Sequence, residues 1–230
     1  MMRRTTIYFP HNYSMFAVSL LILVLAVDLL FIGVIGSAFA DVGFGPTMIS
    51  LILISTFIGS YVNIPISKLR TRIPIAKDRF VRFFGMVYRI PQVEYGEKST
   101  LIAVSLGGAL IPTLVSFYLM WSHPSVIFYA LVGITLVMIV TKLIARPVRG
   151  RGITMPAFIS PLVAAAVAYL LPSGLPTVVA YVSGVLGTLI GADLLNLNAI
   201  PGLGAPIVSI GGAGTFDGVF MSGIIAVLLV

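Results

Sequence analysis

The sequence predicts an all-α polytopic membrane protein with about seven transmembrane helices, and three observations support this prediction. The chain of 230 residues is 59% hydrophobic and only 9% charged, whereas a soluble domain usually carries about 25% charged residues. Its mean hydropathy is +1.12. The apolar residues also gather in long windows, and a helix needs roughly 20 such residues to cross a hydrocarbon core about 30 Å thick.

Seven apolar windows of roughly spanning length follow one another along the chain. Proline, glycine and short polar runs separate them, as expected for the ends of helices. The windows lie at residues 15–38, 46–61, 100–120, 125–143, 155–171 and 176–197 and within 206–230. We therefore expect residues 1–230 to form a single membrane domain.

The basic residues indicate the topology of these windows. All 14 Lys and Arg residues fall into three clusters, with two predicted spans between one cluster and the next. Two of them precede the first window, eight lie between the second and third, and four surround the connection between the fourth and fifth. By the positive-inside rule all three clusters face the cytoplasm. The amino terminus is then cytoplasmic, and seven spans put the carboxyl terminus outside.

The segment 65–98 is the largest piece predicted outside the membrane. Its basic residues alternate with aromatic residues, which are Phe80, Phe83, Phe84 and Tyr88. We expect a small cytoplasmic interfacial element that is held by anionic lipid headgroups. Alternating apolar residues at 63–66 and 90–95 leave room for a short hairpin, whose edge could hold an extended peptide.

Three aspartates stand inside apolar windows: Asp28 in the first, Asp193 in the sixth and Asp217 in the seventh. A charged aspartate at the centre of a span costs roughly 2.5 to 3.5 kcal/mol on insertion scales, so such residues are candidates for function. None of the three windows contains Lys or Arg. Each acid must therefore be protonated, share a proton with another acid, bind a cation or face water.

The chain has no cysteine and only two histidines, His11 and His123. This composition excludes thiol catalysis, iron–sulfur clusters and cysteine- or histidine-rich metal sites. We expect neither a metal nor another cofactor, and no nucleic-acid partner. A serine mechanism is also disfavoured, because no histidine lies at membrane depth to activate a serine.

Asp193 and Asp217 form the most plausible pair. Between them lies an evident turn at 198–206, and residues equidistant from a turn lie at equal depth in an antiparallel helical hairpin, here predicted over 176–230. The midpoint of the two acids is three residues from the centre of this turn, an offset of only about 4.5 Å along a helix. We therefore expect that the two carboxyl groups can meet, and a pair in contact shares one proton, which is the state that an aspartic protease uses.

The backbone around this pair is rich in glycine, including Gly212, Gly214 and Gly218. Irregular backbone at membrane depth is tolerated only where it is buried in protein or lines a water-filled cavity. The alternative is that these glycines only permit close helix packing, as in Gly187-xxx-Gly191 and Gly214-xxx-Gly218. Asn196, three residues after Asp193, could orient that carboxylate or cap the helix end.

With these residues the sequence resembles the GxGD-type intramembrane aspartyl proteases, the presenilin and signal-peptide-peptidase group. Gly212-Ala213-Gly214-Thr215-Phe216-Asp217 is similar to the second motif of that family, and Asp193 before Leu194-Leu195 is similar to the first. The chain departs from the family by two extra residues between Gly214 and Asp217 and by Ala192 in place of the usual tyrosine. Along its length it also resembles an uncharacterised family of prokaryotic multi-pass membrane proteins.

The resemblance implies a membrane endopeptidase in which Asp193 and Asp217 activate water to attack a peptide bond of a bound transmembrane segment. Two alternatives stay open at the level of the sequence. In the first, Asp28, Asp193 and Asp217 bind a proton or cation in a transporter. In the second, the acids are protonated and hydrogen-bonded within a non-catalytic membrane scaffold.

Overall fold

The computed structural model describes residues 32–83, 86–148, 152–203, 207–212 and 218–230. Within these ranges the chain is mainly helical, but it also contains five strands. The predicted all-α class is therefore only partly right. Most of the first predicted window lies outside the described residues, as do Asp28, Gly214 and Asp217.

The described helices agree best with the windows at 46–61, 125–143, 155–171 and 176–197, whereas most of the first window lies outside the described residues and the third and last windows are helical only in part. They are Ile32–Asp41, α2 (Pro46–Ser60), α3 (Ile111–Ser122), α4 (Ile127–Ile144), α5 (Ile159–Leu170), α6 (Pro176–Thr188) and α7 (Gly218–Leu228). A π turn at Leu106–Leu110 precedes α3, and a 3-10 turn at Pro124–Val126 precedes α4. Helix α6 continues as a π turn, Leu189–Asp193, and then as a 3-10 helix, Leu194–Leu203.

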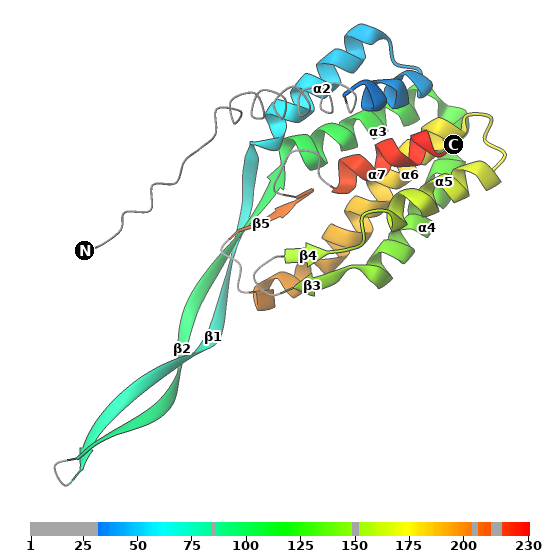
Figure 1. Cartoon of the computed structure of the whole chain (residues 1–230). Helices are drawn as coiled ribbons and strands as arrows, with labels where there is room; N and C mark the ends of the chain where they lie inside the picture. Colours follow the sequence, from blue (N-terminus) through cyan, green and yellow to red (C-terminus); the bar gives the residue numbers. More distant parts are fainter. Residues whose placement is uncertain (1–31, 84–85, 149–151, 204–206, 213–217) are drawn as a thin grey trace, which may run out of the picture.

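Helix α6 is the centre of the bundle (Figure 1). Every residue from Val178 to Thr188 is buried, because α3, α4, α5 and α7 all pack against this helix. A helix that is apolar on all sides is stable only when neighbours cover it all round. The sixth window therefore forms the core of the fold.

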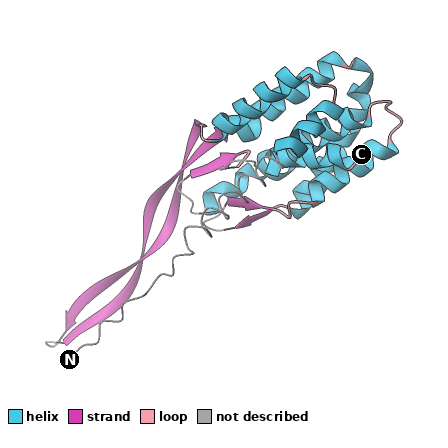
Figure 2. Ribbon diagram, turned by 45° about the horizontal axis from the view of Figure 1, so that its top comes forward, coloured by secondary structure: helices cyan, strands magenta, loops and turns pink. Residues whose placement is uncertain are grey.

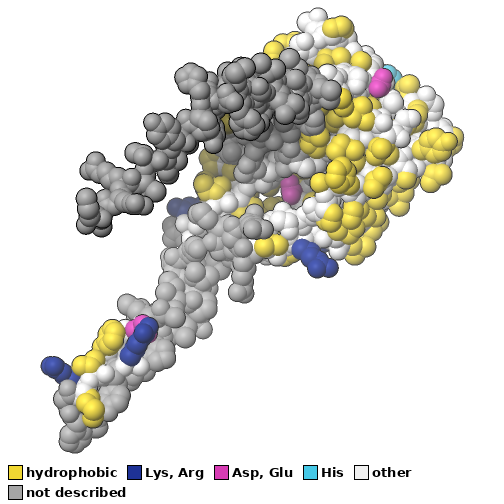
Figure 3. Space-filling model, viewed as in Figure 1, with side chains coloured by type: hydrophobic (Ala, Val, Ile, Leu, Met, Phe, Trp, Pro, Cys, Tyr) yellow, Lys and Arg dark blue, Asp and Glu magenta, His cyan; other side chains and the backbone are white. Residues whose placement is uncertain are grey.

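Two helices, Pro124–Ile144 and Pro176–Ile200, are long and apolar enough to cross a membrane. The other five apolar helices within the described residues have between 10 and 17 residues. Many large apolar side chains are nevertheless exposed on the bundle, and they form broad patches on the face seen in Figure 3. Exposed examples are Ile54, Phe117, Phe128, Leu143 and Tyr169. Two helices thus support the predicted membrane class, and the count of seven spans stays a prediction.

The segment predicted to be a small interfacial element with room for a short hairpin forms a long β-hairpin; its position at the membrane surface stays a prediction. Strand β1 (Asn63–Phe83) pairs in antiparallel register with β2 (Met86–Ser105), from Asn63 opposite Ser105 to Phe83 opposite Met86. The hairpin projects well beyond the helical bundle (Figures 1 and 2). The third window was predicted to be helical from residue 100, but it stays a strand as far as Ser105.

The helix that follows begins where its first turn is capped. The side chain of Ser105 accepts a hydrogen bond from the backbone N–H of Gly108 over 3.1 Å, which satisfies a donor that the start of a helix leaves unpaired. Before this cap, residues Leu101–Val104 of β2 pair not only with β1 but also with β5 (Ile207–Ile210). Strand β5 lies parallel to them at the edge of the sheet β1-β2-β5. An apolar window cannot by itself distinguish such a strand from a buried helix.

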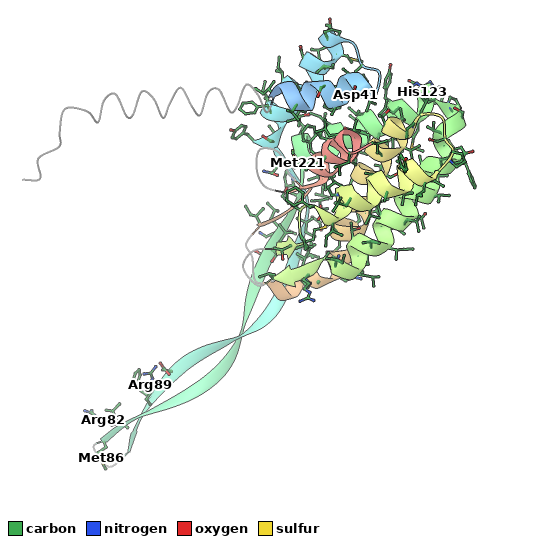
Figure 4. All side chains as sticks on the ribbon, turned by 45° about the vertical axis from the view of Figure 1, so that its right-hand side comes forward. Asp41, Arg82, Met86, Arg89, His123 and Met221 are labelled. Atoms are coloured by element: carbon green, nitrogen blue, oxygen red, sulfur yellow. The ribbon has the colours of Figure 1, made fainter. Side chains whose placement is uncertain are left out.

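All five strands lie toward one end of the bundle (Figure 1). The short strands β3 (Arg146–Val148) and β4 (Gly152–Thr154) form an antiparallel pair there, beside the 3-10 helix that follows α6. Asp41 and His123 lie at the other end (Figure 4). The connection between α6 and α7 differs from the simple turn that the sequence predicted at 198–206. Its described residues form a 3-10 helix, Leu194–Leu203, and then strand β5.

Candidate functional site

Asp193 lies at the strand end of the bundle, as the last residue of the π turn that follows α6. Its carboxylate Oδ2 accepts a hydrogen bond of 2.7 Å from the backbone N–H of Gly211, just after strand β5. Gly211 has a φ of +77°, and a Cβ there would lie 2.5 Å from Cβ of Ala109. Only glycine fits this position without strain.

A cavity of about 340 Å³ opens beside Asp193. Strand β4 and Met155 form one part of its wall, and β5 forms another. Thr188, Ala192 and Asp193 border it from the α6 side, and Gly212, Gly218 and Val219 border it from the approach to α7. The site therefore joins segments that are far apart in the sequence, and polar and apolar groups share its wall.

Three of the residues predicted for the site, Asp193, Gly212 and Gly218, border this cavity together. Asp217, Gly214 and Asp28 lie outside the described residues. The glycine pair Gly187 and Gly191 packs against α4, at Val137 and at Thr141. For these two glycines the close-packing interpretation is right, whereas Gly218 has open space where a Cβ would be.

The amide of Asn196 serves the backbone of its own helix. It donates hydrogen bonds to the carbonyl oxygens of Gly191 and Ala192, over 3.1 and 2.8 Å. Its Oδ1 accepts a hydrogen bond of 2.7 Å from Nζ of Lys142, at the end of α4. Of the two roles predicted for Asn196, these contacts correspond to the capping of helix carbonyls.

Sequence reasoning missed Lys142, which we counted only as a marker of topology. It also missed a cluster of three buried hydroxyl groups from α5, α6 and α7. Ser160 Oγ is hydrogen-bonded to Thr188 Oγ1 and, over 2.6 Å, to Ser222 Oγ, and Thr188 Oγ1 donates to Ser222 Oγ over 3.0 Å. The only signal in the sequence was a few hydroxyl residues within apolar helices, which is too common to single them out.

The cluster joins three helices directly beside the cavity, because Thr188 also borders that cavity. All three side chains are almost fully buried, and each hydroxyl group finds partners within the cluster, as buried polar groups require. Among the described residues, no three His, Cys, Asp or Glu side chains gather as ligands for a metal ion.

Within the described residues the protein is mainly helical, has two helices that are long and apolar enough to cross a membrane, and places the carboxylate of Asp193 at a cavity at one end of its bundle. The chain belongs to the family DUF1614, described as a protein of unknown function, which its residues 57–229 match. No curated protein and no solved structure matches the chain.

Proposed function

We propose that this protein is an intramembrane aspartyl protease that hydrolyses peptide bonds in or near transmembrane segments, with Asp193 and Asp217 as its catalytic carboxyl groups. The observation that supports this most is the carboxylate of Asp193 at a cavity of about 340 Å³ in an apolar helical bundle. Gly212 and Gly218, which flank the stretch containing Asp217 in the sequence, border the same cavity.

The proposed reaction needs one ionised and one protonated carboxyl group. The ionised group takes a proton from water while the water oxygen bonds to the peptide carbonyl carbon. The protonated group gives its proton to the leaving nitrogen, and the C–N bond breaks. The hydrogen bond from Gly211 N–H fixes one oxygen of Asp193 and so helps to orient this carboxyl group. No cofactor enters the scheme.

The surroundings of the cavity suit an extended peptide. Strand β5 forms the edge of the described sheet, and its residues Ile207, Val208 and Ser209 border the cavity. An edge strand offers unpaired backbone groups, to which an extended segment can add as a further strand. The cavity volume falls near the lower end of the range for small binding sites, about 300 to 1,000 Å³.

In this proposal all seven helices cross the membrane and the strand end faces the cytoplasm. The distribution of charge supports this orientation. Each Lys or Arg whose side chain the structure describes lies on the hairpin or at the strand end, and these are Lys68, Arg82, Arg89, Lys142 and Arg146. The outward apolar side chains of the bundle would then face lipid tails.

The hairpin is proposed to rest on anionic lipid headgroups of the cytoplasmic leaflet. Phe80, Met86 and Val87 are exposed near its tip beside the exposed arginines Arg82 and Arg89, and three of these residues are labelled in Figure 4. Such a mixture fits a headgroup surface, because the apolar groups enter it while the arginines bind phosphate. Both arginines are charged at physiological pH, as arginine always is in proteins, and Arg89 also donates a hydrogen bond to Oδ2 of Asp78, which raises the pKa of Arg89.

The deciding experiment is cleavage of a labelled transmembrane reporter by the purified full chain in lipid. We expect Asp193→Asn and Asp217→Asn each to reduce cleavage by at least about 100-fold, because each removes one half of the acid–base pair. Asp41→Asn, at the other end of the bundle, is the matched control and should cleave as the wild type does.

Cleavage by either Asn variant at the wild-type rate would refute the assignment of Asp193 and Asp217 as the catalytic pair. If the folded wild type cuts none of several reporters, the protease proposal fails. A proton or sodium flux that Asp28→Asn abolishes would then favour a transporter.

A further inference from the structure

We infer that Asn196 and Lys142 are positioning residues for Asp193: together they hold the π turn that presents its carboxylate to the cavity. The inference rests on the proposed function only for the catalytic role of Asp193. The contacts themselves are independent of that function, and they join the end of α4 to the π turn and the 3-10 helix that follow α6.

The π turn at Leu189–Asp193 interrupts the regular hydrogen bonding of α6, and the chain then tightens into a 3-10 helix. Such changes of helix type alter the direction of the side chains that follow and leave carbonyl groups without their usual backbone donors. The amide nitrogen of Asn196 donates to two carbonyl oxygens in this stretch, those of Gly191 and Ala192. Asn196 thus stabilises the turn immediately before Asp193.

Lys142 fixes the orientation of this amide. An ammonium group only donates hydrogen bonds, and a carbonyl oxygen only accepts them. The oxygen of the amide must therefore face Lys142 Nζ, at 2.7 Å, and its nitrogen must face the carbonyl groups. Lys142 Nζ also donates to the carbonyl oxygen of Leu195 over 2.6 Å. One exposed lysine therefore orders two groups of the 3-10 helix.

Close packing of α4 against α6 and its π turn brings Lys142 within hydrogen-bond distance of Leu195 and Asn196. Gly191 has no side chain and lies against Thr141, the residue before Lys142. The hydroxyl of Thr141 also donates to the carbonyl oxygen of Gly187 over 3.3 Å. Asp193 is thus held from two sides, by the end of α4 through Asn196 and by Gly211 N–H after β5.

The test uses Lys142→Met, Lys142→Arg and Asn196→Asp in the full chain reconstituted in lipid. The first readout is the rate at which a carbodiimide labels Asp193, measured by mass spectrometry. We expect Lys142→Met and Asn196→Asp to raise this rate severalfold, because the carboxylate leaves Gly211 N–H when the turn relaxes. Lys142→Arg should retain the wild-type rate, since a guanidinium group can donate to both oxygens.

Arg146→Met is the matched control, because it removes a neighbouring exposed cation that has no part in the proposed contacts. Its labelling rate should equal that of the wild type. In reporter cleavage, Lys142→Met should lower kcat about tenfold with KM unchanged, as expected for a residue that orients a catalytic group.

An unchanged labelling rate in both Lys142→Met and Asn196→Asp would overturn the inference, whatever happens to cleavage. So would the same increase in Arg146→Met. Wild-type protein that labels as expected but cuts no reporter would instead refute the proposed function and leave the positioning of Asp193 intact. The two failures are therefore distinguishable.

Discussion

Gly187 of α6 lies directly against Val137 of α4, so closely that a Cβ on Gly187 would come within 2.6 Å of Cβ of Val137. This contact sets the spacing of the two helices. One turn further along, the same spacing brings Gly191 against Thr141, and then Lys142 to Asn196. The geometry around Asp193 therefore depends on how closely α4 packs against α6 and the π turn that follows it.

Gly187→Ala should destabilise the protein by about 1 to 3 kcal/mol, because an added methyl group in a filled contact forces the helices apart. Thermal or denaturant unfolding in detergent, followed by the fluorescence of Trp121, would measure the loss. Gly36→Ala is the control, since its Cβ would meet only Ile49 at an ordinary distance of 3.8 Å. Equal stability of the two variants would contradict the packing argument.

Gly211→Ala should cost roughly 1 to 3 kcal/mol through its positive φ alone, with a further loss from the clash with Ala109. Gly174 is a matched control, because its φ is +72° but nothing lies within 4 Å of its Cβ position. Gly211→Ala should therefore be the less stable variant in the same unfolding measurement. Only Gly211→Ala should also change carbodiimide labelling of Asp193. If both variants label alike, Gly211 does not hold the carboxylate.

Thr188→Val should destabilise the protein by about 0.6 kcal/mol and by no more than about 1.7 kcal/mol, which are the average and the maximum for hydrogen bonds between membrane helices. Because Ser222 belongs to the same cluster, Thr188→Val combined with Ser222→Ala should cost less than the sum of the single variants. Thr135→Val is the control, since that hydroxyl bonds only within its own helix, to the carbonyl of Leu131 over 2.8 Å. Strictly additive losses would show that the three hydroxyl groups do not act as one cluster.

The hairpin prediction can be tested with one fluorescent label, because the chain has no native cysteine. A polarity-sensitive dye on Met86→Cys should shift to the blue in bilayers with anionic lipid, compared with zwitterionic bilayers. Arg82→Gln should lower the affinity of the tip for anionic bilayers, measured by titrating this shift with lipid, about fivefold. This factor corresponds to roughly 1 kcal/mol of binding free energy per basic residue. A dye on Phe128→Cys in the bundle should give the same spectrum in both lipids. An unshifted Met86 label would argue against lipid binding by the tip.

Much of the fold could be predicted from the sequence because long apolar runs have few structural solutions. The windows at 46–61 and 125–143 agree with α2 and α4 to within a few residues. Asp193 was found in the same way, since an acid in an apolar helix is costly enough to need a reason. Asp217 was singled out by the same argument and stays a prediction.

The sequence by itself thus determined where most helices run, and it singled out three acids in apolar windows. Both results follow from local composition, because apolar side chains favour the membrane interior and a charged carboxylate there is costly. Only the tertiary structure decided that Thr100–Ser105 is a strand, since this stretch pairs with the start of β1 on one side and, at Leu101–Val104, with β5, about a hundred residues later, on the other. The contact between Lys142 and Asn196 spans 54 residues in the same way. Local sequence patterns cannot predict these contacts, because the contacts depend on how segments far apart in the sequence pack together in three dimensions.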